Sequence, residues 1–173
     1  MLLGIVSDTH GYFHPELERA LADVDLILHA GDVGSEEILD RLEQIAPTRA
    51  VYGNVDGLAL QRRLPEVLEL DAAGIKIVMM HIAGRPGRLD ASARTEIERA
   101  LPQMFICGHS HILQIERIRE YGAMLFVNPG AAGKQGLHRH KTCVRIRIED
   151  GRALQAEVVH LDEPNGQPPT SDG

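Results

Sequence analysis

The 173-residue sequence has no hydrophobic run near the roughly 20 apolar residues that a membrane-spanning helix needs. It also lacks a basic segment before its apolar start, so residues 1–6 indicate a core strand rather than a signal peptide. Basic residues are in deficit, with 18 Lys and Arg against 25 Asp and Glu and a net charge of -7. From these absences we expect neither export nor membrane insertion, and they argue against general binding to nucleic-acid backbones or anionic membranes.

Cysteine is equally scarce, since Cys107 and Cys143 are the two cysteines and form no C-x-x-C pair. We expect two reduced, buried thiols and a reducing compartment, the cytoplasm. A chain of this length can bury a core without disulfide bonds or structural metals. We therefore expect a single domain over residues 1–162. Residues 163–173 concentrate Pro, Gly, Asn, Ser and Asp and are expected to form a flexible C-terminal tail.

The first third of the sequence alternates short apolar runs with amphipathic patterns of helical period. The runs predict strands at 2–7, 25–29 and 48–52, and the amphipathic patterns predict helices at about 15–23 and 35–45. Together these elements form a βαβαβ unit in which both helices cover a sheet.

After residue 64 the expected strands follow one another more closely. They fall at 66–71, 75–80, 103–107, 112–118, 122–127, 141–149 and 153–160, with one helix near 91–100. The last four are expected to be antiparallel, because residues 143–149 alternate apolar and charged side chains and so have one buried and one solvated face. We predict an α/β fold: a four-layer α-β-β-α sandwich of two mixed sheets flanked by helices.

Polar residues gather where the expected core strands end. The clusters are Asp8-Thr9-His10-Gly11, His29-Ala30-Gly31-Asp32, Gly53-Asn54-Val55-Asp56, His81 and Gly108-His109-Ser110-His111. Each cluster alone suits a turn or a helix cap. The carboxyl ends of parallel strands form the ligand crevice of an α/β sheet, however, and burying so many polar groups together without a cation would be costly. The clusters therefore predict a metal centre at one sheet edge.

The residue types indicate which metals such a centre would hold. Imidazole, carboxylate and amide oxygen without thiolate suit Mn, Ni, Fe, Zn or Co rather than calcium or a thiolate zinc site. A carboxylate shared by two ions holds them about 3.5–4 Å apart, the separation at which two metals clamp the oxygens of a phosphoryl displacement. We expect two divalent transition-metal ions, with Mn favoured, and Asp32 is the candidate bridge.

These motifs, in this order, resemble the signature of the calcineurin-like metallophosphoesterases. The similarity covers essentially residues 1–160, includes Asn128-Pro129-Gly130, and is greatest to the small YfcE-type phosphodiesterases. It implies attack on phosphorus by a hydroxide that bridges two metals, with Asp32, Asn54 and His109 as catalytic residues. The metal ligands that it implies are Asp8, His10, Asp32 and His111 for one ion and Asp32, Asn54, His81 and His109 for the other.

Two positions depart from the family pattern. Val55 stands where many relatives have a histidine that acts as a general acid, and Ala83 stands where relatives commonly have a second histidine after His81. The loss of the acid implies phosphodiesters with good leaving groups, or a proton from another residue. Asp56 would be such a residue if it pointed inward, and otherwise it caps the following segment.

Other charged residues and histidines have weaker assignments. Arg85 and Arg88 follow His81 and are candidate phosphate contacts, because guanidinium forks suit that anion, although both also suit a solvated loop. His138 is a third candidate contact, in the basic run 138–141, which could equally be a solvated turn. His29 is expected to orient Asp32. His14 and His160 are expected at the surface.

The functional prediction is a metal-dependent phosphodiesterase that acts on small, nucleotide-like phosphodiesters. One alternative is a phosphomonoesterase or nucleotide phosphatase with the same dinuclear site, although departure of an alkoxide from a monoester benefits from the missing acid. The other is a non-catalytic protein-binding scaffold on the same fold, like the retromer subunit similar to these enzymes. The complete ligand set favours an enzyme. Among partners we expect no nucleic-acid duplex and no membrane, and a homo-oligomer stays open.

Overall fold

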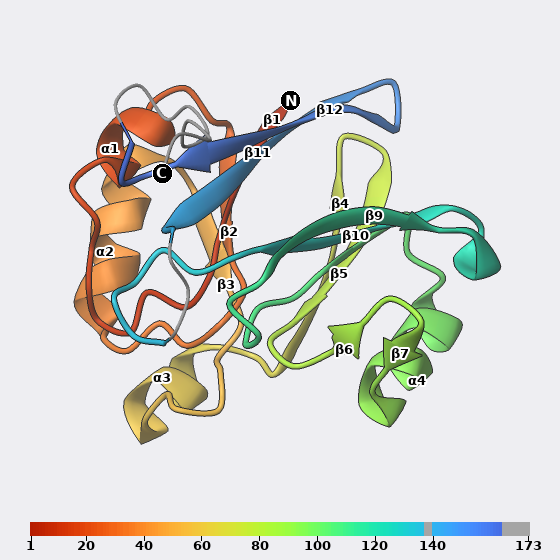
Figure 1. The fold of residues 1–173 in the computed structure, drawn as a ribbon, viewed down its shortest axis with the longest axis horizontal. Coiled ribbons are helices and arrows are strands. Elements are labelled where there is room, and N and C mark those ends of the chain that lie inside the picture. Colours follow the sequence, from red (N-terminus) through yellow and green to blue (C-terminus); the bar gives the residue numbers. More distant parts are fainter. Residues whose placement is uncertain (137–139, 164–173) are drawn as a thin grey trace, which may run out of the picture.

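The structure, a computed structural model, describes residues 1–136 and 140–163 (Figure 1). Its first sheet is mixed, in the order β12-β11-β1-β2-β3. Strands β1, β2 and β3 run parallel, whereas β11 pairs antiparallel with both β1 and β12. Its strands are β1 (Leu2–Val6), β2 (Leu26–His29), β3 (Thr48–Ala50), β11 (Thr142–Glu149) and β12 (Arg152–His160).

The second sheet is also mixed, in the order β4-β5-β8-β10-β9. Its three central strands are parallel, and the two edge strands pair antiparallel with their neighbours. The strands are β4 (Val67–Ala72), β5 (Ile75–Met80), β8 (Met104–Ile106), β9 (Leu113–Ile118) and β10 (Met124–Pro129). A separate two-stranded hairpin, β6 (Gly84–Arg85) and β7 (Arg88–Leu89), follows β5.

Helices cover the outer faces of the two sheets. Figure 1 shows α1 and α2 beside the first sheet and α4 beside the second, so the predicted four-layer α/β sandwich is confirmed. The helices are α1 (Leu17–Ala20), α2 (Glu36–Ile45), α3 (Leu58–Arg63) and α4 (Ala91–Ala100), with a 3₁₀ turn η1 (Arg119–Tyr121).

Several element boundaries differ from the sequence-based prediction. The helix expected at about 15–23 is only the single turn α1, because the Val24 N–H bonds the Leu21 carbonyl in a tighter turn that leads into β2. Strand β3 ends at Ala50 rather than near 52. Neither α3 nor the β6–β7 hairpin was predicted. Among the described residues, every helix is too short and too polar to cross a membrane.

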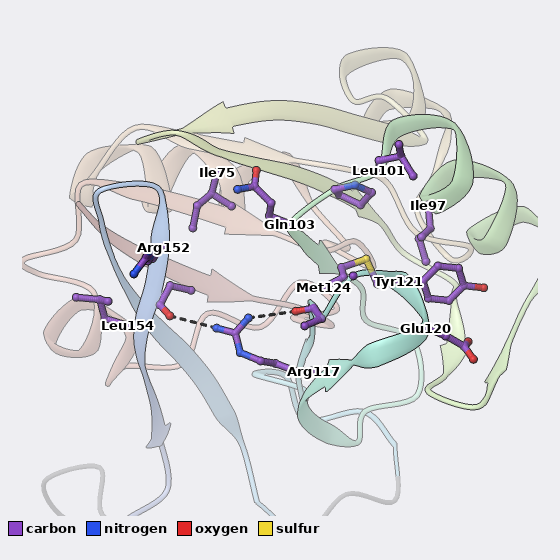
Figure 2. A pocket seen from close by; sticks show the side chains of 14 residues that line it. Ile75, Ile97, Leu101, Gln103, Arg117, Glu120, Tyr121, Met124, Arg152 and Leu154 are labelled. Carbon is purple, nitrogen blue, oxygen red and sulfur yellow. Dashed lines mark hydrogen bonds between the residues drawn. The ribbon is translucent and has the colours of Figure 1, made fainter.

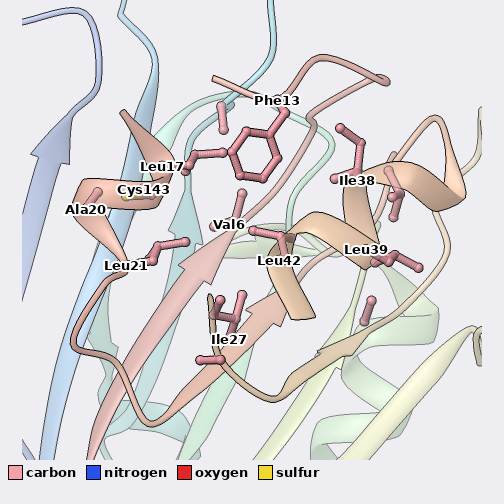
Figure 3. Close-up of a cluster of buried hydrophobic side chains, with 14 of the residues drawn as sticks. Val6, Phe13, Leu17, Ala20, Leu21, Ile27, Ile38, Leu39, Leu42 and Cys143 are labelled. Carbon is pink, nitrogen blue, oxygen red and sulfur yellow. The ribbon is translucent and has the colours of Figure 1, made fainter. Parts of the chain in front are cut away.

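Apolar side chains fill the three spaces between the four layers. In β1, Leu3 and Ile5 face the second sheet while Val6 faces α1 and α2, as the period of two in a strand requires. Figure 3 shows the outer cluster, in which Val6 packs with Leu17 and Leu42 from the two helices. The sheets are thereby held face to face, which fixes their strand ends relative to one another.

The expectation that the two cysteines are buried and unpaired is confirmed. Cys107 and Cys143 are both unpaired and fully buried. Burial raises the pKa of each thiol to about 12, because a thiolate would lose its hydration. Both cysteine side chains therefore act as small core residues.

The flexible tail expected over residues 163–173 lies outside the described residues apart from Glu163.

Candidate metal centre

The candidate ligands follow the carboxyl ends of parallel strands in both sheets. Asp8 and His10 follow β1, Asp32 follows β2 and Asn54 follows β3 in the first sheet. In the second sheet, His81 follows β5, and His109 and His111 follow β8. Because the sheets pack face to face, these loops meet at one edge of the molecule.

Six of the seven predicted ligands fall into two groups of three. Asp8, His10 and His111 form one group, and Asp32, His81 and His109 form the other. Within each group the potential ligand atoms lie within 4.8 Å of one another, although the residues are up to about a hundred positions apart in the chain. Each group combines side chains from both sheets.

Asp32 lies between the two groups. Its Oδ2 is 3.2 Å from His81 Nε2 in its own group and 3.9 Å from His10 Nε2 in the other. In the first group, Asp8 Oδ1 is 3.1 Å from His111 Nε2, and the Nε2 atoms of His10 and His111 are 3.4 Å apart. The nitrogen and oxygen atoms thus converge on two neighbouring points, with the Asp32 carboxylate between them.

The donor set fits divalent ions at both points. His81 Nδ1 is 2.7 Å from the Ala30 carbonyl, which can only accept, so Nδ1 carries the proton and Nε2 offers a lone pair in the neutral ring. Among the described residues, the buried atoms His81 Nε2 and Asp8 Oδ1 have no hydrogen-bond partner. Buried polar atoms are normally satisfied, so two orphaned atoms that face the same centre are what a cation site requires.

Electrostatic coupling in the centre shifts several pKa values. Burial disfavours the Asp32 carboxylate, but its contact with His81 and the Val55 N–H outweigh that cost and lower its pKa. Burial likewise opposes charge on His81, yet the Asp32 and Asp8 carboxylates raise its pKa. Contact with Asp8 raises the pKa of His111 against the effect of burial. The Asp32 carboxylate is therefore held ionised, as metal binding needs, and protons compete with metal for His81 and His111.

Backbone strain is concentrated at the same residues. Non-glycine residues seldom adopt positive φ, because Cβ meets the neighbouring backbone. In the described part of the chain nine do so, and five of these are candidate ligands. They are Asp8, His10, Asp32, His109 and His111, with φ between 48° and 66°. Strain of about 1–3 kcal/mol per residue persists where the surroundings enforce it, typically at functional sites.

Glycines next to the ligands allow the close approach of the loops. A Cβ on Gly53 would collide with the Asp32 carboxylate, and one on Gly31 would lie 2.6 Å from His81 Nδ1. These contacts explain in physical terms why Gly precedes both Asn54 and Asp32.

Asn54 and Asp56 lie in the loop after β3 and differ in surroundings. Asn54 is exposed, and the N–H of the next residue, Val55, donates to Asp32 Oδ1 at 3.1 Å, which brings this loop to the centre. Asp56 is buried, and its carboxylate accepts the N–H groups of Gly53, Val33 and Gly34 at 2.7–3.1 Å. Asp56 therefore ties the Asp32 loop to the Asn54 loop and does not cap α3.

His29 connects two ligand loops through hydrogen bonds to Gly31 and Thr9 rather than through Asp32 itself. The Gly31 N–H donates to His29 Nδ1, so the ring proton is on Nε2 and is donated to Thr9 Oγ1, which in turn donates to the Val33 carbonyl. Burial lowers the His29 pKa from 6.5 to about 4. The neutral ring thus fixes Thr9, between the ligands Asp8 and His10, against the strand end that leads to Asp32.

Asn128 supports the loop that bears His109 and His111. It is buried in β10, and its Nδ2 donates to the Gly108 carbonyl at 2.8 Å and to Ser110 Oγ at 3.0 Å. Its Oδ1 accepts the Gly130 N–H at 3.0 Å. No structural role for Asn128 followed from the sequence, where it is a polar residue at the end of an apolar strand and part of the family-like block Asn128-Pro129-Gly130.

The candidate substrate contacts have less structural support than the ligands. Arg85 and Arg88 face each other across the exposed β6–β7 hairpin, and neither has an ion pair within the described ranges. His138 lies outside the described residues. Lys141, at the end of the same basic run, forms an ion pair with Asp162 at 3.0 Å, so its charge is offset.

The expected surface position of His14 is wrong. His14 is buried, with Nε2 3.3 Å from Asp162 Oδ1 and the Glu16 N–H donated to Nδ1, because the C-terminal end of β12 folds back over this loop. His160 is half-buried.

A cavity of about 690 Å³ lies away from the metal centre (Figure 2). Its lining includes Ile75, at the start of β5, and Gln103, just before β8. His81 and His109 follow the opposite ends of these two strands, so the cavity and the candidate ligands lie at opposite edges of the second sheet.

Sequence comparison identifies relatives of the whole chain. The family model for the calcineurin-like phosphoesterase superfamily domain matches residues 1–151. A probable metallophosphoesterase of Methanocaldococcus jannaschii is 36% identical, over 94% of this chain and 83% of that protein. A second probable metallophosphoesterase, from Methanothermobacter thermautotrophicus, is 31% identical and covers 95% of both chains.

Solved structures share the fold at lower identity. Vps29 of Entamoeba histolytica, solved with Zn²⁺, has a TM-score of 0.69 and 21% identity over 94% of this chain and 100% of that chain. A conserved Streptococcus pneumoniae protein, described as a predicted phosphoesterase, has a TM-score of 0.68 and 22% identity over 93% and 90% of the two chains. At this identity the likeness establishes the fold.

Proposed function

The chain belongs to the calcineurin-like phosphoesterase superfamily, and from this premise we propose that it hydrolyses small phosphodiesters with two bound divalent ions. Family membership and the two groups of candidate ligands support a metal-dependent phosphoesterase. The observation on which the dinuclear proposal rests is the Asp32 carboxylate, whose Oδ2 lies within 4 Å of histidines from both groups.

The ligand assignment follows the two groups. One ion would be held by Asp8, His10, Asp32 and His111, and the other by Asp32, Asn54, His81 and His109. Divalent ions at these points would lower the pKa of bound water and offset the charge of the phosphoryl oxygens. Mn²⁺ suits this mixture of imidazole and oxygen donors, as do Ni²⁺, Fe²⁺, Zn²⁺ and Co²⁺.

The chain's own groups orient the substrate. The exposed side chain of Asn54 offers an amide oxygen to the metal and an N–H₂ group to a substrate oxygen. Asp32 stays ionised and is fixed by the Val55 N–H, so its position does not depend on substrate. His109 lies on the exposed side of its group, next to the incoming phosphate.

Preference for diesters follows from the residue after Asn54. Val55 cannot donate a proton to a leaving oxygen, and Asp56, whose carboxylate accepts three backbone N–H groups, is held away from that task. Leaving groups that are weak bases then depart without an acid, which favours activated diesters over alkyl monoesters. The two buried, unpaired thiols support a reducing compartment, the cytoplasm, as the place of action.

A non-catalytic scaffold is the second candidate. The observation that favours it is the presence of exposed apolar residues, among them Val55 and Ile112, beside the candidate ligands. Exposed apolar clusters often mark protein interfaces. The retention of all seven ligand positions favours the enzyme.

The direct test is hydrolysis by protein stripped with a chelator and reloaded with Mn²⁺ or Ni²⁺. Bis(p-nitrophenyl) phosphate, an activated diester, should be cleaved faster than an alkyl monoester such as glycerol 3-phosphate, whose alkoxide leaves poorly without an acid. Asp32→Asn should lower kcat/KM at least about 100-fold, since it removes the shared ligand of both ions. Asp40→Asn, on the exposed face of α2, is the matched control and should retain activity.

Loss of no more than a few-fold in Asp32→Asn would contradict the two-metal proposal. Faster cleavage of the monoester would replace the phosphodiesterase by the phosphatase alternative. No hydrolysis of either compound by fully metal-loaded protein would favour the scaffold.

A further inference from the structure

Exposed apolar side chains are concentrated around the candidate metal centre. In the part of the chain that the structure describes, eight large apolar residues are exposed. Five of them come shortly after candidate ligands in the sequence, and we call these five the apolar rim. The rim consists of Val55, Leu58, Ile82, Ile112 and Leu113.

Backbone connections place the rim at the mouth of the centre. Val55 donates its N–H to Asp32 Oδ1 at 3.1 Å. Ile82 and Ile112 directly follow His81 and His111, and neighbouring Cα atoms are about 3.8 Å apart. The ligand atoms of each group lie within 4.8 Å of one another, so the backbone of the residues that follow them lies close to the same centre.

Three of the five rim residues are well exposed, whereas Ile82 and Leu113 are each 36% exposed to solvent. Val55 is 56%, Leu58 69% and Ile112 65% exposed to solvent. Single exposed apolar residues are ordinary, but several beside a binding site gain free energy only when a ligand covers them.

The metal centre and the apolar rim together suit a ligand that has an anionic part and an apolar part. A centre with two divalent ions attracts the phosphate anion. The apolar rim offers no charge or hydrogen bond from its side chains, so it suits a group without them. Small-molecule sites commonly combine such an apolar wall with a few polar groups that fix orientation.

We propose that the apolar rim receives an uncharged apolar ester group, aryl or alkyl, of the phosphodiester whose phosphate is bound at the metal centre. The inference rests on the proposed function and narrows its substrate class. Diesters with nucleotide-like arms, whose sugar is polar throughout, are then the poorer substrates.

Binding of phosphinate anions tests the inference without any turnover. Diphenylphosphinate, dibutylphosphinate and dimethylphosphinate have the same charge as a phosphodiester, are not hydrolysed, and differ only in their arms. Calorimetry on the Mn²⁺-loaded protein should show the diphenyl compound or the dibutyl compound binding about tenfold more tightly than the dimethyl one, a difference of about 1.4 kcal/mol. Whichever of these two compounds binds more tightly shows whether the rim prefers an aryl or an alkyl arm.

Two variants link this preference to the rim. The double variant Val55→Ser/Ile112→Ser should reduce the tenfold ratio to about twofold or less, while affinity for dimethylphosphinate stays within about twofold. Both residues are exposed, so the substitutions leave the core unchanged. The control is Leu154→Ser, which removes an equally exposed leucine, 57% accessible, beside the cavity at the opposite edge. It should keep the wild-type ratio.

Hydrolysis separates failure of the inference from failure of the proposed function. p-Nitrophenyl diesters with phenyl, butyl or thymidine second arms have one leaving group in common, and the apolar arms should give the higher kcat/KM. The inference is overturned, and the phosphodiesterase proposal left intact, if all three diesters are cleaved and the thymidine ester is cleaved fastest. The same conclusion follows if the rim variant keeps the tenfold ratio of phosphinate affinities. No cleavage and no phosphinate binding by metal-loaded protein overturns both, and assigns the rim to a protein partner.

Discussion

At the scale of single residues, the candidate centre depends on side chains that bind no metal themselves. Five candidate ligands adopt left-handed backbone conformations, which cost free energy unless neighbouring contacts enforce them. Those contacts come from buried polar residues whose hydrogen bonds are fully used. His29 bonds Thr9 and Gly31, and Asp56 bonds three backbone N–H groups. We regard these residues as the positioning framework of the ligands.

His29 makes the stability of the metal-free protein depend on pH. Its pKa is lowered from 6.5 to about 4, so between these values the unfolded chain binds more protons than the folded one. The contribution of His29 to the free energy of unfolding is therefore fully present above pH 6.5 and is lost as the pH falls through 4. The total loss from this one group should be about 3 kcal/mol.

Urea unfolding of the metal-free protein between pH 7 and 4 measures this effect. His29→Asn keeps an acceptor for the Gly31 N–H but does not titrate, so the other ionisable groups cancel in the difference from wild type. The difference in unfolding free energy between wild type and variant should narrow as the pH falls. A difference that stays constant across this range would show that His29 is not held neutral.

At the scale of elements, the ligands depend on how loops are held at strand ends. The loop after β8 carries His109 and His111, and it is fastened by Asn128 from the neighbouring strand β10. The loop after β1 is fastened by Gly133 and Ala132, whose N–H groups donate to the Asp8 and Ser7 carbonyls at 3.0 Å. Strand pairing therefore sets the positions of the ligands.

Removal of the Asn128 side chain should weaken both stability and metal binding. Asn128→Ala leaves the Gly130 N–H without its buried partner and removes one of the two donors to the Gly108 carbonyl, which also accepts the Ser110 N–H, so it should cost about 1–3 kcal/mol of unfolding free energy. Metal affinity should fall, because the His109–His111 loop loses its attachment. Gln155→Ala, at an exposed position of β12, is the control for both measurements. Unchanged metal affinity in Asn128→Ala would mean that the loop holds its shape unaided.

The sequence predicted the elements whose side-chain pattern matches their packing. Strands β1, β5 and β8 end where polar clusters begin, so both the strands and the ligand-bearing ends were found. The length of α1 was overestimated because its apolar spacing continues through Leu21 and Val24, which reach the core from a turn. The helix α3 was missed because it buries little besides Leu60.

Long-range contacts at the site left no pattern in the sequence. Asp56 bonds Val33 from 23 positions away, and Asn128 bonds Gly108 from 20 positions away. Their roles arise from the pairing of strands, and residue types at a fixed spacing cannot reveal them. The exposed rim was missed for a similar reason, since its members are scattered over about sixty residues of sequence.

At the scale of the whole molecule, the candidate centre joins the two sheets. Each group of ligands takes members from both: Asp8 and His10 with His111, and Asp32 with His81 and His109. A bound ion would thus link loops that apolar packing between the sheets has already aligned. The cavity at the opposite edge contributes no candidate ligand.

The number of divalent ions bound per chain tests the central claim most directly. Protein loaded with Mn²⁺ and freed of excess metal should contain two ions by elemental analysis, His111→Ala and His81→Ala should each retain one, and Asp32→Ala should retain fewer than one. A wild-type chain that binds one ion or none, or an Asp32→Ala variant that still binds two, would contradict a dinuclear centre bridged by Asp32.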